Sequence, residues 1–313
     1  MTRIVITEFL ETDAVDELKR RGYDVHYDST LWTKRAELEK MLRDLPGLIV
    51  RNRTQVNQAL LELAPKLKVL GRLGVGLDNI DVKACEARGV EVCSARGANA
   101  TSVSEYAIAM AMLLLRGRAY LDTHRLMAGE WPREELGRGV ELAGKTLGVI
   151  GLGSIGSTSA RKARALDMRV IASDPYLSDD SENWNLSEKV SLDELLARAD
   201  VITIHCPLNP ETRGLIGAAQ MKRMKKGAIL INSARGGIVD EAACAAALKS
   251  GHLGGAALDV FDYEPIKAEA GNAFAGIPNV ILTPHISGVT VEATHRVSVM
   301  TVDSVVRVLK KGT

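Results

Sequence analysis

The feature that most constrains the fold of this chain is the glycine pattern GLGSIG at residues 151–156. An apolar run precedes the pattern, and a helix-like run and a second apolar run follow it, at residues 146–150, 155–166 and 169–172. In such a strand–turn–helix unit the first glycine permits a tight turn, the second lets a pyrophosphate approach the backbone, and the third lets the helix pack closely on the strand. The pattern therefore predicts a dinucleotide site built on Gly151, Gly153 and Gly156.

Asp174 follows the second apolar run, 23 residues after Gly151. At that distance a carboxylate can accept hydrogen bonds from both hydroxyl groups of a ribose, while the N-terminus of the helix faces the phosphates with free N–H groups. The negative charge of Asp174 would repel the 2′-phosphate of NADP, and no arginine directly follows Asp174 to bind that phosphate. We therefore expect NAD as the cofactor. A glycine-rich turn that binds nothing is the alternative, but the strands, the helix and the acidic residue all fall where a dinucleotide site requires them.

The composition limits the class of protein. A chain of 313 residues is long enough for two domains. Because 46% of the residues are apolar, 25% are charged and the formal net charge is +1, neither nucleic acid nor a membrane is expected as a partner. No apolar run reaches the length of a membrane span, and the chain begins with a strand-like run, so we expect a cytoplasmic protein. The four cysteines form no C-x-x-C pair, which indicates neither a disulfide framework nor a metal site.

Runs of strand and helix character alternate along the first 95 residues. The predicted strands are 3–7, 24–27, 47–54, 68–76 and 90–95, and the predicted helices are 13–21, 33–42, 56–63 and 82–87. Five strands with helices between them in so short a stretch indicate a small parallel sheet with helices on both faces.

A long helix rich in Ala, Met and Leu is predicted at residues 99–118 and breaks this rhythm. Because it is too apolar to lie free on the surface, we expect it to cross between two domains and to pack against a second subunit. A polar, glycine-rich linker at 129–144 leads into a second β/α series. Its further strands are predicted at 201–206, 228–234, 255–261 and 279–284, and its further helices at 191–198, 217–224, 240–250 and 291–309. The expected fold class is α/β, with two doubly wound parallel-sheet domains of Rossmann or flavodoxin type.

Four polar residues follow or end strands of the second series, namely Arg235, Asp259, Glu264 and His285. Ligands of open α/β sheets bind beyond the carboxyl ends of the strands, so these side chains suit a site beside the dinucleotide. An arginine can hold a carboxylate and a carbonyl oxygen, and a histidine can move the hydroxyl proton while hydride passes between C2 of a substrate and nicotinamide. A neighbouring carboxylate would orient the imidazole.

Three of these residues also have a purely structural interpretation. Arg235 would then be a solvated turn residue, Glu264 part of a surface turn and His285 a cap at the end of a strand. The remaining histidines lie in strand patterns, helices or turns and are assigned structural roles; they are His26, His124, His205, His252 and His295.

Taken together, the motifs resemble those of the D-isomer-specific 2-hydroxyacid dehydrogenase family, which includes phosphoglycerate dehydrogenases. The matching stretches cover essentially the whole chain: GRLGVGLDNID (71–81), NATSVSEYAIAM (99–110), GLGSIG (151–156), SDP (173–175), HCPLNPETRGLI (205–216), LINSARGGIVDEAA (230–243), GGAALDVFDYEP (254–265) and TPHISGVTVEA (283–293). The resemblance implies an NAD-dependent oxidoreductase that interconverts a small D-type 2-hydroxy acid and its 2-oxo acid. It also implies an NAD-binding domain at 98–286, inserted in a substrate domain made of 1–97 and 287–313, with a cleft between the two.

The resemblance implies roles for individual residues. The catalytic set would be Arg235, Glu264 and His285, with His285 as the acid/base. The implied cofactor contacts are Gly151, Gly153, Ser154, Ile155, Gly156, Asp174, Pro207, Thr212, Ser233, Ala234, Arg235, Asp259, His285 and Gly288. The substrate carboxylate would be held by backbone N–H groups of Gly74, Val75 and Gly76, which agrees with GVG as an anion-binding nest.

The stretch VRNRT at 50–54 bears on the choice of substrate. Arg51, Asn52 and Arg53 could bind a second anionic group at C3, such as a phosphate or a sulfonate, whereas a lactate-type substrate would require an apolar wall. The alternative is that one arginine points to solvent and the other pairs with a carboxylate. Within the family, VITEF, IVRNRTQV and GEWPR are similar to (S)-sulfolactate dehydrogenases.

Other functions remain open at this point. Within the same class, the substrate pair could be D-3-phosphoglycerate or hydroxypyruvate and glyoxylate. A function of a different class is that of an NAD(H)-sensing corepressor, which some proteins of this fold have. The presence of the complete catalytic set argues against this alternative. A homodimer that forms through the cofactor domain is expected from the apolar helix at 99–118.

Overall fold

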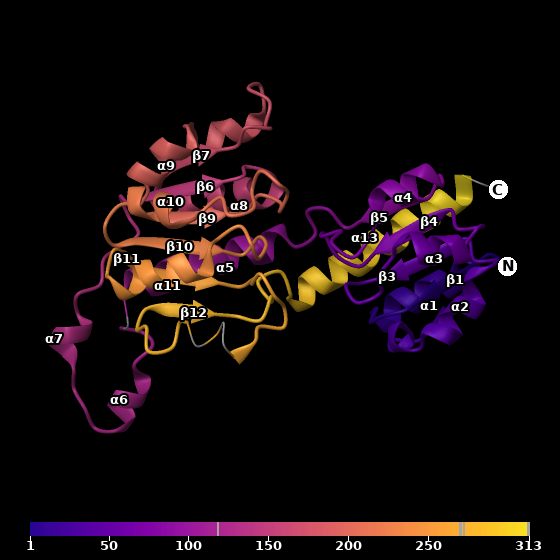
Figure 1. Ribbon diagram of the computed structural model, residues 1–313, viewed down its shortest axis with the longest axis horizontal. Coiled ribbons are helices and arrows are strands. Elements are labelled where there is room, and N and C mark those ends of the chain that lie inside the picture. Colours follow the sequence, from indigo (N-terminus) through magenta and orange to yellow (C-terminus); the bar gives the residue numbers. More distant parts are fainter. Residues whose placement is uncertain (118, 269–270, 272, 312–313) are drawn as a thin grey trace. The chain divides into compact units, whose positions relative to one another are not determined.

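The computed structural model describes residues 1–117, 119–268, 271 and 273–311, and the chain divides into two units. Unit 1 contains Met1–Asn99 and Val289–Thr313, and unit 2 contains Ala100–Gly288 (Figure 1). The predicted boundaries were 97/98 and 286/287. Each unit consists of one parallel sheet covered by helices, which confirms the predicted α/β fold class.

The sheet of unit 1 has five parallel strands in the order β2-β1-β3-β4-β5. The strands are β1 (Arg3–Ile6), β2 (Asp24–Tyr27), β3 (Gly47–Val50), β4 (Val69–Arg72) and β5 (Glu91–Ser94). The helices between them are α1 (Thr12–Arg20), the 3₁₀ helix η1 (Leu31–Thr33), α2 (Arg35–Leu42), α3 (Gln58–Leu63) and α4 (Val82–Ala87). The strands β3 and β4 end four residues earlier than predicted, because the chain turns after Val50 and because Gly74 has a φ of 141°, a conformation that glycine alone adopts freely.

The helix α13 (Val291–Lys311) belongs to unit 1 and packs on its sheet. Its buried residues are Ala293, Ser298, Thr301, Val302, Val305, Val306 and Leu309. A glycine in the facing strand makes room for it, since a Cβ on Gly71 would lie 2.6 Å from Cγ2 of Val305. The C-terminal helix and β4 therefore fit closely, although more than 200 residues separate them in the chain, as in the 229-residue separation between Thr301 and Arg72.

The sheet of unit 2 has seven parallel strands in the order β12-β11-β10-β9-β6-β7-β8. The strands are β6 (Thr146–Ile150), β7 (Arg169–Ser173), β8 (Glu188–Lys189), β9 (Val201–Ile204), β10 (Ala228–Asn232), β11 (Leu253–Leu258) and β12 (Val280–Leu282). The helices that cover it include α5 (Ala100–Leu115), α8 (Ser154–Arg164), α9 (Leu192–Arg198), α10 (Ala218–Arg223) and α11 (Glu241–Lys249). The strand order reverses at β6, which pairs with β7 on one side and with β9 on the other. Ligands bind at the carboxyl ends of the strands beside such a reversal.

The strands of this sheet are apolar on both faces. In β10, Leu230 belongs to one buried cluster, whereas Ile229 and Ile231 belong to the cluster on the opposite face. The same alternation in β9 places Ile202 in the first cluster and Val201 in the second. A sheet with helices on both faces requires such continuous apolar runs, which is why the strands were readable from the sequence.

The helix α5 differs from its prediction in two respects. It ends at Leu115, so Gly117 lies beyond it, and Arg118, the predicted last residue, lies outside the described residues. The whole helix belongs to unit 2, where it packs against α8, β10 and β11, so it does not itself cross between the units. The prediction that this helix crosses between two domains rests on its apolar surface, which needs a partner. In the structure that partner is the sheet of unit 2.

Several short elements are absent from the prediction. The 3₁₀ helix η2 (Glu182–Leu186) and the strand β8 lie between β7 and α9. The helices α6 (Thr123–Met127) and α7 (Arg133–Leu136) lie on a segment that projects from the sheet of unit 2 (Figure 1), and α7 falls inside the predicted linker. Elements this short have too few residues to show a periodic pattern. In the described part of the chain, no helix is both long and apolar enough to cross a membrane.

Candidate active site

The glycine turn joins β6 to α8 at the point where the strand order reverses. Gly151 has a φ of 88°, and a Cβ on it would lie 2.8 Å from the amide nitrogen of Cys206. A Cβ on Gly156 would lie 2.1 Å from the carbonyl oxygen of Gly151, so this glycine lets the helix pack against the turn. Around Gly153 no atom lies within 4 Å of such a Cβ, which leaves open space in front of the N-terminus of α8. The turn therefore fits a pyrophosphate at Gly153, as the pattern predicts.

Asp174 ties the end of β7 to this turn. Its Oδ2 accepts a hydrogen bond of 2.8 Å from the amide of Leu152, and its Oδ1 accepts bonds of 3.0 Å and 3.1 Å from the amides of Tyr176 and Leu177. Asn183 donates from Nδ2 to the carbonyl oxygen of Leu152 at 2.9 Å and so holds the turn from its other side. Asn183 was not singled out in the sequence, because it lies on a short 3₁₀ helix with no recognisable pattern.

The predicted adenosine residues Pro207 and Thr212 lie in one loop after β9 and contact each other. The hydroxyl of Thr212 donates to the carbonyl oxygen of Pro207 at 2.7 Å, and its amide donates to Oδ1 of Asn209 at 2.9 Å. These bonds close the loop on itself and fix its backbone. Ser154 and Ile155 form the first turn of α8.

His205 follows β9 next to the glycine turn, but its side chain belongs to the interior of unit 2. Its Nε2 lies 3.2 Å from the hydroxyl oxygen of Ser159 and 3.1 Å from that of Thr203. Burial lowers the pKa of His205 to about 3, so the ring is neutral at any pH near 7. Burial also raises the pKa of the adjacent Cys206 thiol to about 11, which keeps that side chain neutral as well. Neither group is suited to proton transfer.

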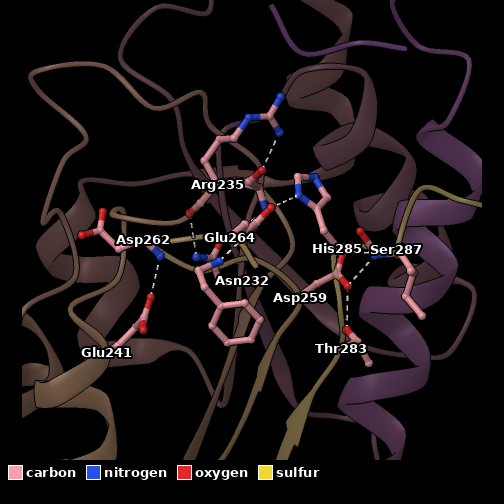
Figure 2. Close-up of polar contacts among 12 residues, drawn as sticks. Asn232, Arg235, Glu241, Asp259, Asp262, Glu264, Thr283, His285 and Ser287 are labelled. Atoms are coloured by element: carbon pink, nitrogen blue, oxygen red, sulfur yellow. Dashed lines mark hydrogen bonds and ion pairs between the residues drawn. The ribbon is translucent and has the colours of Figure 1, made fainter. Parts of the chain in front are cut away.

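The side chains of His285 and Glu264 meet at the carboxyl edge of the sheet (Figure 2). Nδ1 of His285 lies 2.7 Å from Oε2 of Glu264, and the other carboxylate oxygen, Oε1, accepts a hydrogen bond of 3.0 Å from the amide of Phe261. Because a carboxylate only accepts, the Nδ1 position carries the proton, which leaves Nε2 to exchange a proton with a ligand. The side chain of His285 is 48% exposed, so this nitrogen is accessible.

The buried carboxylate of Asp259 fixes the loop that carries His285. Oδ1 accepts hydrogen bonds of 2.6 Å from the hydroxyl of Thr283 and 2.8 Å from the amide of Ile286, and Oδ2 accepts one of 2.8 Å from the amide of Ser287 (Figure 2). His285 itself donates its amide to the carbonyl oxygen of Asp259 at 2.8 Å and has a φ of 56°, which is uncommon for a residue other than glycine. Asp259 is fully buried, so the structure assigns it this supporting role, and the predicted nicotinamide contact stays a prediction.

Tyr106 extends this network from α5. Its hydroxyl lies 2.9 Å from that of Thr283, and burial raises the pKa of Tyr106 to about 12. Thr283 and Tyr106 were missed in the sequence, since neither residue type alone indicates a role behind a buried carboxylate.

Arg235 lies just beyond β10 on the same edge (Figure 2). Its Nη1 donates to the carbonyl oxygen of Ala234 at 2.6 Å. The buried side chain of Asn232 holds the backbone here, because Nδ2 donates to the carbonyl oxygen of Arg235 at 2.9 Å and Oδ1 accepts from the amide of Ala234 at 3.1 Å. Asn232 was not singled out in the sequence, although a polar residue at the end of the buried strand ILIN is a signal that could have identified it.

Ser233 and Gly288 complete the predicted cofactor contacts. The hydroxyl of Ser233 is buried and has no hydrogen-bond partner among the described residues, which is the condition expected of a group that a bound ligand satisfies. Gly288 follows Ser287 at the end of unit 2. Within the described residues, no group of three or more His, Cys, Asp or Glu side chains is arranged to hold a metal ion.

The predicted substrate residues lie in unit 1, on the loops that follow β3 and β4. The backbone amides of Arg51, Asn52 and Arg53 all donate to the carboxylate of Glu8, a residue that was not singled out in the sequence. In the second loop, the amide of Gly74 donates to the carbonyl oxygen of Arg72 at 2.9 Å. The structure thus gathers Arg235, Glu264, His285 and Asp259 in unit 2, and the meeting of this group with the loops of unit 1 in a common cleft stays a prediction.

Comparisons with known proteins agree with this geometry. Residues 108–287 match the family model described as D-isomer specific 2-hydroxyacid dehydrogenase, NAD binding domain. The chain is 47% identical over 310 residues to the (S)-sulfolactate dehydrogenase of Chromohalobacter salexigens, with 99% of both chains covered. It is 38% identical to the D-3-phosphoglycerate dehydrogenase of Archaeoglobus fulgidus, of which it covers 57%, while 98% of this chain is covered.

A solved structure of a protein from Thermus thermophilus superposes on the chain with a TM-score of 0.88 at 34% identity, covering 99% of this chain and 97% of that one. The glycine turn, Asp174 and the His285–Glu264 pair lie within the region that the family model matches. The chain therefore belongs to the D-isomer specific 2-hydroxyacid dehydrogenase family and is an NAD-dependent oxidoreductase.

Proposed function

We propose that the protein acts on a small D-type 2-hydroxy acid that carries a second anionic group, with (S)-sulfolactate as the first candidate. The observation that carries the proposal is the 47% identity, over 99% of both chains, to an enzyme named for that substrate. The loop with Arg51 and Arg53 supports it, because guanidinium groups suit a sulfonate or a phosphate.

The geometry in unit 2 supports the catalytic roles that we propose for His285, Glu264 and Arg235. Bound NAD supplies the hydride acceptor when the hydroxy acid is oxidised. Nε2 of His285 takes the proton from the C2 hydroxyl, and in the reverse direction it returns this proton to the C2 oxygen. Glu264 holds the Nδ1–H of His285 at 2.7 Å, which fixes the ring orientation and stabilises the imidazolium that proton uptake creates. Arg235 holds the substrate carboxylate and the C2 oxygen by parallel hydrogen bonds.

A second candidate substrate is D-3-phosphoglycerate, which the 38% identity to the Archaeoglobus fulgidus enzyme favours. The chain spans only 57% of that relative's length, so this relationship supports the substrate less strongly than the full-length match does. Hydroxypyruvate and glyoxylate, and an NAD(H)-sensing role without turnover, are the remaining alternatives, and the assembled His285–Glu264 pair argues against the last.

The test is a substrate panel. NAD reduction is measured with both sulfolactate enantiomers, D-3-phosphoglycerate, D-glycerate and D-lactate, and NADH oxidation with hydroxypyruvate and glyoxylate. The Arg51→Ala and Arg53→Ala variants are assayed alongside the wild type. We expect the highest kcat/KM with one sulfolactate enantiomer and a loss of at least about tenfold in one or both variants, since a charged hydrogen bond contributes about 1.5–3 kcal/mol. A preference for D-lactate that neither substitution changes contradicts the proposal.

We also propose a homodimer that forms through unit 2. The projecting segment with α6 and α7 carries apolar side chains that are largely exposed in the single chain, with Met127 at 84% and Trp131 at 80% exposure. Exposed apolar side chains gathered on one projecting segment are typical of an interface, and a second copy of the chain would cover them. Light scattering measures the mass, and Trp131→Glu should convert the dimer to a monomer, whereas a monomeric wild type contradicts the proposal.

A further inference from the structure

We propose that Glu8 is a positioning residue that holds the loop at residues 51–54, so that the arginine side chains of this loop, and not its backbone amides, recognise the second anionic group of the substrate. This inference rests on the proposed function for its ligand, but the arrangement of the loop itself does not depend on the substrate.

The carboxylate of Glu8 occupies a ring of backbone donors. Oε1 accepts hydrogen bonds of 2.9 Å from the amide of Arg51 and 3.0 Å from that of Thr54. Oε2 accepts bonds of 3.1 Å and 2.9 Å from the amides of Asn52 and Arg53. Four consecutive N–H groups thus converge on one carboxylate, in the manner in which backbone nests bind anions.

Glu8 is suited to remain an anion in this place. It is 3% exposed and follows β1, whose neighbour β3 leads directly into the loop. Burial by itself would raise the pKa of Glu8, but the hydrogen bonds from the amides of Thr54, Arg51 and Arg53 outweigh it and hold the pKa below its ordinary value. The side chain therefore carries its charge throughout the neutral range.

The acceptor side of the same loop is held by Asn79. Its Nδ2 donates to the carbonyl oxygen of Thr54 at 2.7 Å and to that of Arg51 at 3.3 Å. The hydroxyl of Thr54 lies 2.7 Å from that of Thr7, which neighbours Glu8. Asn79 is 8% exposed, so two buried polar side chains clamp the loop from its donor and acceptor sides. Such a fully satisfied network fixes one backbone conformation.

This arrangement decides which groups can meet a substrate. The nest at residues 51–54 is already filled by an internal carboxylate, so a sulfonate or a phosphate cannot bind to it. The guanidinium carbon of Arg53 lies 4.6 Å from the centroid of the Trp32 ring, which restricts its orientation by a cation–π contact. The guanidinium of Arg51 forms no ion pair with any described side chain. Recognition of the second anion therefore falls to these two side chains, presented on a backbone that Glu8 fixes.

The test compares Glu8→Gln and Glu8→Asp with Glu37→Gln. A glutamine has one acceptor oxygen and one NH₂ group. Its NH₂ group would therefore face some of the backbone N–H groups of residues 51–54, which need an acceptor. An aspartate keeps the charge but is shorter by one methylene. Glu37 lies on α2 of the same unit and is exposed, so its substitution makes the same charge change away from the loop. Kinetic constants are measured with sulfolactate, D-lactate and NAD, and amide hydrogen exchange is measured for residues 51–54 in the absence of substrate.

We expect Glu8→Gln to raise the KM for sulfolactate about tenfold or more, with kcat within about twofold and the KM values for D-lactate and NAD unchanged. Exchange at residues 51–54 should be faster in both Glu8 variants and unchanged in Glu37→Gln. If Glu8→Gln does not fold, the same split is measured with Glu8→Asp. A rise in KM that is equal for sulfolactate and D-lactate, or wild-type exchange in this loop, overturns the positioning role.

The two proposals fail in different ways. If the wild type prefers D-lactate and the Arg51 and Arg53 variants show the same preference, the proposed substrate is wrong, and so is the role of Glu8 in substrate recognition. Faster amide exchange at residues 51–54 in the Glu8 variants would in that case still establish that Glu8 holds the loop. If the wild type prefers sulfolactate, and the arginine variants lose activity with sulfolactate while Glu8→Gln keeps it, only the inference about Glu8 is overturned.

Discussion

Nδ1 of His285 lies 2.7 Å from Oε2 of Glu264, and both groups are held by the backbone around them. The amide of Phe261 donates to the second oxygen of the carboxylate at 3.0 Å. The backbone of His285 has a φ of 56° and donates to the carbonyl oxygen of Asp259. The ring is thus oriented by contacts within the protein itself, which reduces the reorganisation that proton transfer requires.

Glu264→Gln should lower kcat at least about tenfold, with the Kd for NADH within about twofold of the wild type. A glutamine oxygen can still accept from Nδ1–H, but the neutral amide stabilises the imidazolium less than a carboxylate does. Steady-state kinetics and a fluorescence titration with NADH separate the two effects. Glu241→Gln is the matched control, because Glu241 also accepts a backbone hydrogen bond near this site, from the amide of Asp262 at 2.7 Å. Equal activity in both variants would contradict the role of Glu264.

Two glycines of the turn should respond in opposite ways to alanine. Gly153→Ala places a methyl group in open space at a φ of −70°, so we expect an unchanged Tm and a loss of at least about tenfold in NADH affinity, because the methyl group occupies the place of the pyrophosphate. Gly156→Ala places its Cβ 2.1 Å from the carbonyl oxygen of Gly151, and the forced backbone shift should destabilise the fold by about 1–3 kcal/mol. Thermal unfolding and NADH titration measure both. Normal NADH binding by Gly153→Ala would argue against the pyrophosphate position.

Asp259→Asn should destabilise unit 2 and lower kcat together. The asparagine replaces one acceptor oxygen by a donor, and the donors at Thr283, Ile286 and Ser287 cannot all be satisfied, at a cost of about 1–3 kcal/mol. The loop that carries His285 loses its fixed position, so catalysis falls with it. Thr283→Val removes one of these donors and keeps both amide bonds, and we expect a smaller loss of Tm and of kcat. Calorimetry measures Tm and steady-state kinetics measures kcat for both variants. Losses in Thr283→Val as large as those in Asp259→Asn would contradict the supporting role of Asp259.

The stability of unit 2 should decrease in acid because of His205. Its folded-state pKa of about 3 lies below the unfolded value of 6.5, so below pH 6.5 the unfolded chain binds a proton that the folded chain does not. The contribution of the neutral His205 ring to the free energy of unfolding is complete above pH 6.5. It is lost as the pH falls toward 3, with a slope of up to about 1.4 kcal/mol per pH unit. Urea unfolding at pH 7.5 and pH 5 measures it, and His205→Gln should unfold with a smaller difference between the two. An identical pH difference in wild type and variant would contradict the buried, neutral state of His205.

The local patterns of the sequence were sufficient for the fold class. The strands β6 and β10 are continuous apolar runs because both faces of their sheet are covered, and the alternation with helices indicated parallel sheets. The turn at Gly151 was predictable because its three glycines act within six residues of one another. The helix α5 was predicted as a helix, but its partner was not, because an apolar face does not specify which sheet it packs against.

The candidate catalytic residues could be predicted from the sequence, whereas the distant residues that support them could not. Arg235, Glu264 and His285 stood out as polar residues beyond strand ends, and their motifs carried the family resemblance. Tyr106 and Asn183 act only through contacts that folding creates between distant segments, such as the bond between Tyr106 and Thr283, 177 residues apart. Nothing in the sequence near such a residue indicates the group that it will meet.

The two parallel sheets, the glycine turn and the candidate catalytic residues could be predicted from the order of residues, because each strand, each turn and each polar residue beyond a strand is recognised within its own β/α unit. The folded chain was needed to show that Glu264 orients His285, that Asp259 is a buried support, and that Glu8 fills the nest at residues 51–54. Separation along the chain explains the difference: Glu8 and Thr54 lie 46 residues apart, and a hydrogen bond over such a distance exists only once the parallel strands β1 and β3 have paired.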